Sequence, residues 1–163
     1  MWRKIEKKIF DIELFIITIS LFIMLCSVIL QVFVRIFGLN SMGSTEIGML
    51  TMTFLTFIGT SAITYTKDHI SVELEQLIKN KKIVYVMNLL TNITLIIFSI
   101  ILVLVTTKLY LYVLNSGEKT ITLGIPVTIS IGTMVLGALL MIIHALSDLI
   151  NLLKYKDVKM EVK

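Results

Sequence analysis

The sequence predicts an all-α integral membrane protein with four transmembrane helices. Of its 163 residues, 56% are hydrophobic and 16% are charged, and the mean hydropathy is +0.95. Soluble domains carry about 25% charged residues, so lipid is the solvent for most of this chain. A crossing takes about 20 apolar residues, and segments of that kind recur four times. We expect one membrane domain over residues 1–163.

The first crossing is expected at about residues 13–35. Its apolar part, 14–34, contains no charged residue and is long enough for the hydrocarbon core at about 1.5 Å per residue. It follows a basic segment that contains Arg3, Lys4, Lys7 and Lys8. A cleaved signal peptide has a shorter apolar region and a small-residue cleavage site, which we do not find here. We therefore expect this segment to remain in the protein.

The second crossing is expected at about residues 46–65 and is rich in hydroxyl groups. A spacing of three and four residues places several of them on one helical face, namely Thr53, Thr56, Thr60 and Thr64. Such hydroxyls either bond across to another helix or return to a carbonyl one turn earlier in their own helix. The sequence leaves both alternatives open.

A short amphipathic helix is predicted at about residues 70–82, between the second and third crossings. Its apolar residues lie on one helical face, and its lysines gather at the carboxyl end, where they suit the helix dipole. This pattern is typical of a helix that lies in the plane of the membrane interface. An ordinary polar loop is the alternative.

The third and fourth crossings are expected at about residues 84–110 and 126–150. Pro126, the only proline, suits the first turn of the fourth helix. The third helix has one polar face, formed by Asn88, Asn92, Ser99 and Thr106. One face of the fourth helix carries Ser130, Thr133, Gly137, Met141, His144 and Asp148. Polar and small residues of this kind predict faces that pack on other helices.

The distribution of basic residues predicts the orientation. The N-terminal segment, residues 66–83 and the C-terminal tail carry four Lys or Arg each, whereas the two remaining loops carry three in total when Arg35 and Lys108 are included. Basic residues accumulate on the cytoplasmic side of membrane proteins. We therefore expect both termini in the cytoplasm.

Ionisable residues inside a membrane would indicate a functional site. Here they lie near the expected ends of the crossings, where water and headgroups would solvate them: Glu13, Arg35, Glu46, Lys108 and Asp148. This placement argues against an ion path through this chain alone. His144 could bond to Asp148 one turn later, but a packing role is the favoured interpretation. His69 falls in a loop, so the two histidines do not suggest a haem site.

The sequence contains no phosphate-binding glycine loop, no nucleophile and base pair, and no metal-ligand cluster at a usable spacing. We expect no enzymatic activity, no metal and no cofactor. The single cysteine, Cys26, cannot form a disulfide within the chain and is expected to pack. The basic residues flank apolar segments, so they suit membrane lipids rather than nucleic acid.

Several stretches together resemble one transporter family. They are Gln31–Gly38 (QVFVRIFG), Glu46, Phe57–Ala62 (FIGTSA), His69–Glu73 (HISVE) and Leu123–Pro126 (LGIP). In order and spacing this set is similar to the small membrane subunit, the DctQ-like subunit, of tripartite ATP-independent periplasmic (TRAP) transporters. Where the family usually has a tryptophan shortly before the glutamate, this chain has Met42–Thr45.

The resemblance implies a role within an assembly in the bacterial cytoplasmic (inner) membrane. In such systems a soluble extracytoplasmic protein captures an organic acid, such as a dicarboxylate or sialic acid. A large multispan subunit then imports it, driven by sodium. The small subunit is expected to act as a scaffold for the large one and to help dock the binding protein.

The resemblance also suggests which residues of this chain serve structure or partner contact. Arg35 and Glu46 would form an outer pair that fixes the first hairpin or faces the docking surface, with a structural ion pair as the alternative. His69 and Glu73 would lie at the inner turn and touch the large subunit. His144 and Asp148 complete the set of candidates.

Two other functions are compatible with four apolar crossings. A self-sufficient small exporter would need a carboxylate at mid-membrane depth, which the sequence does not offer. A small four-helix membrane anchor of a redox enzyme would be expected to show haem absorbance.

Overall fold

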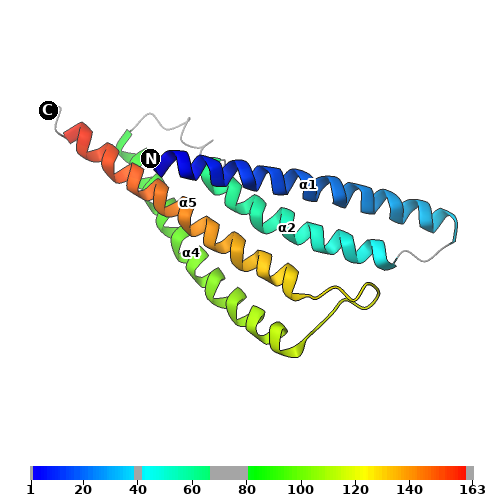
Figure 1. Ribbon diagram of the computed structural model, residues 1–163. Coiled ribbons are helices and arrows are strands. Elements are labelled where there is room, and N and C mark those ends of the chain that lie inside the picture. Colours follow the sequence, from blue (N-terminus) through cyan, green and yellow to red (C-terminus); the bar gives the residue numbers. More distant parts are fainter. Residues whose placement is uncertain (1, 39–41, 67–80, 161–163) are drawn as a thin grey trace.

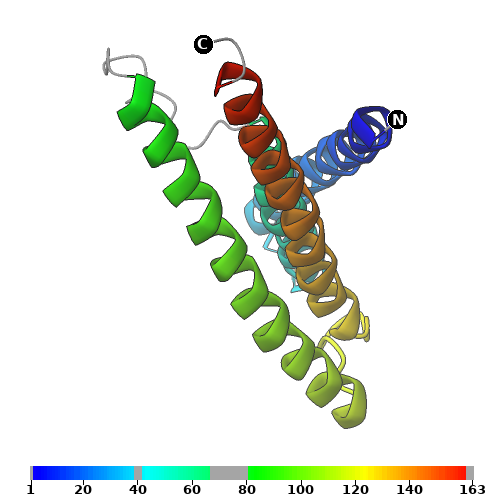
Figure 2. The ribbon, with the colours of Figure 1, turned by 90° about the vertical axis from the view of Figure 1, so that its left-hand side faces the viewer.

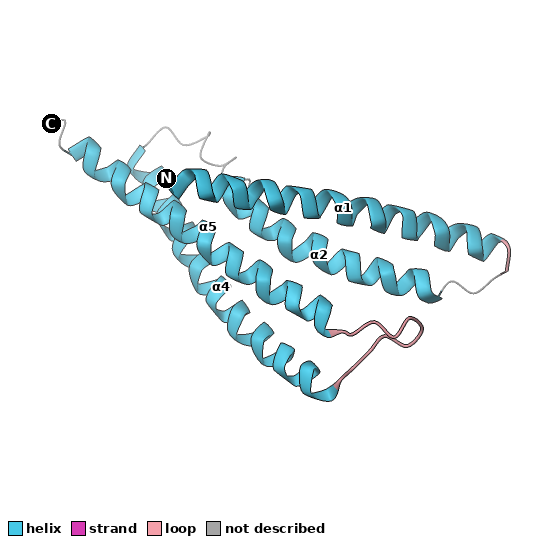
Figure 3. Cartoon of the chain, in the orientation of Figure 1, coloured by secondary structure: helices cyan, strands magenta, loops and turns pink. Residues whose placement is uncertain are grey.

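The computed structural model describes residues 2–38, 42–66 and 81–160, and it consists of long helices (Figures 1 and 3). They are α1 (Trp2–Ile36), α2 (Met42–Thr66), α4 (Lys81–Ser116) and α5 (Thr128–Met160). Each of the 4 is long and apolar enough to cross a membrane, which confirms the predicted all-α class. The predicted interfacial helix, with Glu73, falls mainly on residues outside the described ranges, and its last two positions belong to α4. His69, in the turn expected before this helix, also lies outside the described ranges.

The helices form an open row in the order α1, α2, α5, α4. α1 packs on α2, α2 on α5, and α5 on α4. Figures 1 and 2 show α1 and α4 on opposite sides of the central pair. We call the end of the row that carries the chain termini the terminal end, and the opposite end, with the loop that joins α4 to α5, the loop end (Figure 1).

Polar residues recur every seven positions along the packed faces of the two outer helices. On α1 the buried set is Glu6, Glu13, Ser20 and Ser27, and on α4 it is Asn92, Ser99 and Thr106. A helix returns to nearly the same face after seven residues, so each set forms one continuous seam. Elsewhere on these helices large apolar side chains are exposed, as expected of surfaces that contact lipid. The predicted polar face of the third crossing is thus a packing face.

α2 and α5 approach each other closely at Gly137. A Cβ atom at this position would lie 2.6 Å from the carbonyl oxygen of Phe57 and 2.9 Å from its Cβ. Because one of those atoms belongs to the backbone, a side chain here would force the two helices apart. Gly59 of α2, by contrast, faces open space.

Four threonine hydroxyl groups of α2 donate hydrogen bonds within their own helix. Thr53 donates to Met49 O at 3.1 Å, Thr56 to Met52 O at 2.8 Å, and Thr60 to Thr56 O at 2.6 Å. Thr64 does the same one turn later, at 2.9 Å. Of the two alternatives left open by the sequence, the intrahelical one is found for these four threonines.

α5 begins at Thr128, two residues after the expected position. Pro126 pairs with Lys119 in a β-bridge, and its carbonyl accepts a hydrogen bond from Ile129 N at 3.2 Å. Within the loop, Thr120 N donates to Ile125 O at 2.9 Å. Gly117 and Gly124 have φ values of 66° and 65°, which favour glycine. The proline therefore ends a closed loop and leads into the helix.

Candidate functional site

The carboxylate of Glu46 holds the loop between α4 and α5. Thr122 N donates to its Oε1 at 2.7 Å, and Leu123 N donates to its Oε2 at 2.9 Å. Hydrogen bonds to an ionised acceptor are about twice as strong as neutral ones. We call this arrangement the Glu46 site. It joins the start of α2 to a loop 76 residues further along the chain.

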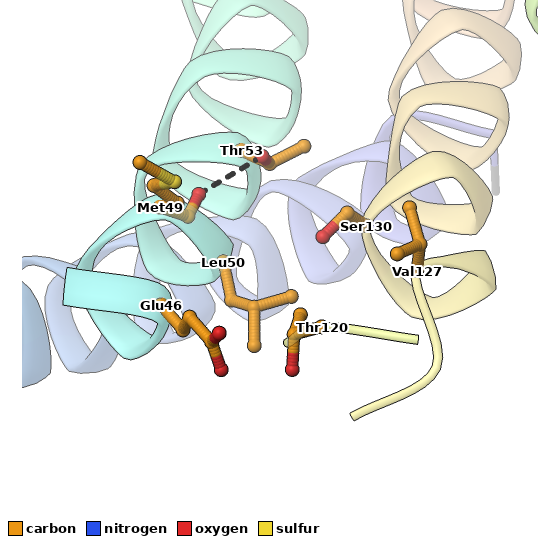
Figure 4. A pocket seen from close by; sticks show the side chains of 7 residues that line it. All are labelled: Glu46, Met49, Leu50, Thr53, Thr120, Val127 and Ser130. Atoms are coloured by element: carbon orange, nitrogen blue, oxygen red, sulfur yellow. Dashed lines mark hydrogen bonds between the residues drawn. The ribbon is translucent and has the colours of Figure 1, made fainter. Parts of the chain in front are cut away.

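A mainly apolar hollow of about 210 Å³ lies beside this carboxylate (Figure 4). Its lining comes from α2, from the loop and from the start of α5: Glu46, Met49, Leu50, Thr53, Thr120, Val127 and Ser130. The loop also covers Gly43, where an added Cβ would lie 3.2 Å from Leu123 Cδ2. The loop end is thus joined by both polar and apolar contacts.

Arg35 lies in the last turn of α1 and is exposed. Among the described residues, no ion pair joins it to Glu46. Both oxygens of that carboxylate are already used by backbone amides. The expected outer pair is therefore not formed, although both residues lie at the loop end. Glu46 fixes the loop between α4 and α5 to α2; it does not fix α1 to α2.

At the terminal end, side chains from three helices meet around His144. The imidazole Nδ1 lies 3.5 Å from Glu6 Oε1, and Nε2 lies 3.4 Å from Glu13 Oε1. Ser61 Oγ donates to Glu13 Oε1 at 2.8 Å, and Ser147 Oγ donates to Glu6 Oε2 at 2.8 Å. We call these five residues the His144 cluster. It connects α1 to both α2 and α5.

The cluster is almost sealed from solvent. Glu13 and His144 are each 1% exposed, and Glu6 is 9% exposed. The ring of Tyr65 meets the His144 ring edge-on at 5.3 Å, and Phe10 stacks on Tyr65 at 4.4 Å. The expectation that water or headgroups solvate Glu13 is wrong, because α2 and α5 enclose it.

Asp148 joins α5 to α4. Asn92 Nδ2 donates to Asp148 Oδ2 at 3.0 Å and also to Asn88 O at 3.1 Å. His144 pairs with the carboxylates of α1, so the local pair with Asp148 that the sequence allowed is not the one formed. Both predicted residues lie on the packed face of α5, as expected.

Sequence reasoning did not select Glu6 or Glu13 as candidate site residues. Glu6 lies in the polar N-terminal segment, and Glu13 lies at the start of the expected first crossing, where it was expected to be solvated. Their spacing was nevertheless a signal, because Glu6, Glu13, Ser20 and Ser27 recur every seven residues. The partner of Glu6 could not be found from this spacing, because Ser147 lies 141 residues further along the chain.

These contacts define a class of protein: a multi-pass α-helical membrane protein whose polar side chains connect its own helices. Among the described residues, no group of three or more His, Cys, Asp or Glu side chains could hold a metal ion.

The family model for "Tripartite ATP-independent periplasmic transporters, DctQ component" matches residues 24–155. The match covers well over half of the chain, so the protein belongs to this family of small TRAP transporter subunits. A comparison with curated proteins gives no match. The family and the four helices agree on a multi-pass protein of the inner membrane. The resemblance read from the sequence is thereby confirmed.

Proposed function

We propose that the chain is the scaffold subunit of a sodium-driven transporter that imports an organic acid, such as a dicarboxylate or sialic acid. It supports the large transport subunit and helps to dock the substrate-binding protein. In this proposal sodium and substrate bind to the large subunit. Both termini lie in the cytoplasm, so the loop end faces outward.

The observation that carries this proposal is the way in which the row is joined at both ends. At the loop end, Glu46 holds the loop between α4 and α5. At the terminal end, His144 lies between two carboxylates of α1. A support for a moving neighbour has to resist relative motion of its own helices, and interhelical polar contacts provide such resistance.

Exposed groups at the loop end support a docking role. Arg35 is a cation without an ion-pair partner among the described residues, and Lys119 is exposed on the loop. If this end faces outward, both offer positive charge to an extracytoplasmic protein. Complementary charge mainly accelerates association. We therefore expect Arg35 to affect the docking rate more than the transport step.

Reconstitution tests the scaffold role. Proteoliposomes would contain this chain, the large subunit or both, and would be supplied with binding protein, organic acid and an inward sodium gradient. We expect uptake only when both membrane subunits are present. Accumulation by this chain alone would contradict the proposal and favour a self-sufficient carrier.

Arg35→Ala tests docking in the same vesicles. We expect slower uptake at low concentrations of binding protein and recovery at high concentrations, with unchanged membrane insertion. Lys108→Ala is the matched control, because Lys108 is another exposed basic residue, on α4. Equal uptake by the Arg35 variant and the wild type at all concentrations would remove Arg35 from the docking surface.

A further inference from the structure

The His144 cluster contains more acidic groups than its one imidazole can neutralise. Among the described side chains, which begin at Lys4 on α1, His144 is the only cation-forming one in ion-pair contact with Glu6 or Glu13. With both carboxylates ionised and the imidazole doubly protonated, one negative charge remains uncompensated. Burying such a charge is strongly unfavourable, and buried groups commonly take up a proton instead.

The geometry gives both imidazole nitrogens an acidic neighbour. Nδ1 faces Glu6 and Nε2 faces Glu13, at 3.5 and 3.4 Å. A neutral imidazole has one N–H and one bare nitrogen, so it cannot donate to both carboxylates. The doubly protonated ring carries an N–H group on each side; at these distances the two contacts are ion pairs, since neither ring nitrogen has a hydrogen-bond partner among the described residues. The first dissociable proton of the cluster is therefore the one that makes the imidazole doubly protonated, between the two glutamates.

A second proton has a place to bind at Glu13. Its Oε1 accepts from Ser61 and faces His144, whereas its Oε2 is buried without a hydrogen-bond partner. A metal ion needs several ligands, and this free oxygen alone supplies too few. A proton needs only one oxygen.

We propose that the His144 cluster is a proton-binding site that holds two dissociable protons among Glu6, Glu13 and His144 at neutral pH. The protons belong to the coupled set rather than to one residue. With both bound, the cluster has no net charge. Loss of the second proton leaves one negative charge between α1 and α5, so the contact between these helices depends on that proton.

The titratable groups around the cluster come from three helices. α1 supplies both glutamates, α2 supplies Tyr65 against the imidazole ring, and α5 carries Asp148 one turn beyond His144. Asn92 of α4 donates to Asp148. Asp148 is thus a second, half-buried carboxyl group that would contribute to the same spectroscopic band, and the experiment must separate it from the cluster.

Infrared spectroscopy of the full chain in lipid bilayers tests the proposal, because a protonated carboxyl group has a C=O stretching band separate from those of carboxylates. We expect this band at neutral pH and its decrease on alkalinisation. It should be lost in Glu13→Gln and also in Glu6→Gln, because the imidazolium then neutralises the single remaining carboxylate. Glu118→Gln, on the exposed loop, is the matched control and should keep the band.

Circular dichroism of each variant shows whether the helices remain folded. The lack of a carboxylic acid band in the folded wild type at neutral pH would overturn the proposal. Persistence of the full band in either folded glutamine variant would also overturn it, by assigning the proton to another group such as Asp148. If one glutamine variant does not fold, two measurements still test the proposal. They are the loss of the wild-type band at alkaline pH and the band of the other glutamine variant.

Discussion

At the loop end one partly exposed carboxylate binds two backbone amides, whereas at the terminal end two glutamates and a histidine are almost sealed from water. At the Glu46 site, water can replace the two backbone amides as hydrogen-bond donors to the carboxylate. In the His144 cluster, water cannot replace the side-chain partners, because Glu13 and His144 are each 1% exposed. The same residue type, glutamate, therefore performs a local task at one end and determines the packing of three helices at the other.

Removal of His144 should have the largest effect. His144→Ala removes the cation that lies between Glu6 and Glu13, and breaking a buried ion pair costs about 3–5 kcal/mol. We expect the free energy of unfolding in mixed micelles to fall by about that amount. Leu146→Ala, which truncates an exposed side chain on the same helix, should change it far less. Equal effects would mean that the buried charges do not stabilise the row.

Gly137→Ala comes next, because it tests the central pair α2 and α5 without touching either end. The new methyl group would meet the carbonyl oxygen of Phe57 at 2.6 Å. Overpacking of this kind costs about 1–3 kcal/mol. Thermal unfolding should show a lower Tm than in Gly59→Ala, where the added methyl group enters open space. An unchanged Tm would place the two helices further apart than described.

Glu46→Ala should have a local effect only. Without its carboxylate, the amides of Thr122 and Leu123 lose their acceptors. Hydrogen exchange should accelerate for residues 120–125 and stay unchanged around His144. Glu118→Ala removes an exposed acid from the same loop and serves as the control. Faster exchange at the terminal end as well would show that the two ends are coupled.

Thr56→Val should have the smallest effect. Thr56 is exposed, and its hydroxyl donates to Met52 O of its own helix at 2.8 Å. Exposed substitutions usually change stability by less than about 0.5 kcal/mol. A loss of stability comparable to that of Gly137→Ala would indicate a packing role for this face that the isolated chain does not show.

Hydropathy was sufficient to predict the four helices, because the membrane allows few ways to satisfy a backbone. The stripe that begins at Asn88 on α4 was also correctly assigned to packing, since small polar groups at helical spacing favour helix contacts. Both inferences depend on residues close together in the sequence.

The sites were harder to predict because their partners are far apart in the sequence. Glu46 was chosen as a residue of structural interest, but its partners are backbone amides, which no side-chain pattern reveals. Glu13 was assigned to solvent because it lies at the expected end of the first crossing. Only the packing of α1 against α2 and α5 buries it, and that arrangement follows from the whole fold.

The central claim, that buried charges hold α1 to α5 at the terminal end, is tested most directly by distances between spin labels. In a Cys26→Ser background, Lys8→Cys with Lys154→Cys reports on the terminal end, and Phe37→Cys with Glu118→Cys reports on the loop end; all four labelled positions are exposed. Pulsed electron paramagnetic resonance in bilayers should give narrow distance distributions for both pairs. We predict that His144→Ala broadens the terminal-end distribution and leaves the loop-end one narrow. An unchanged terminal-end distribution in that variant would contradict the account.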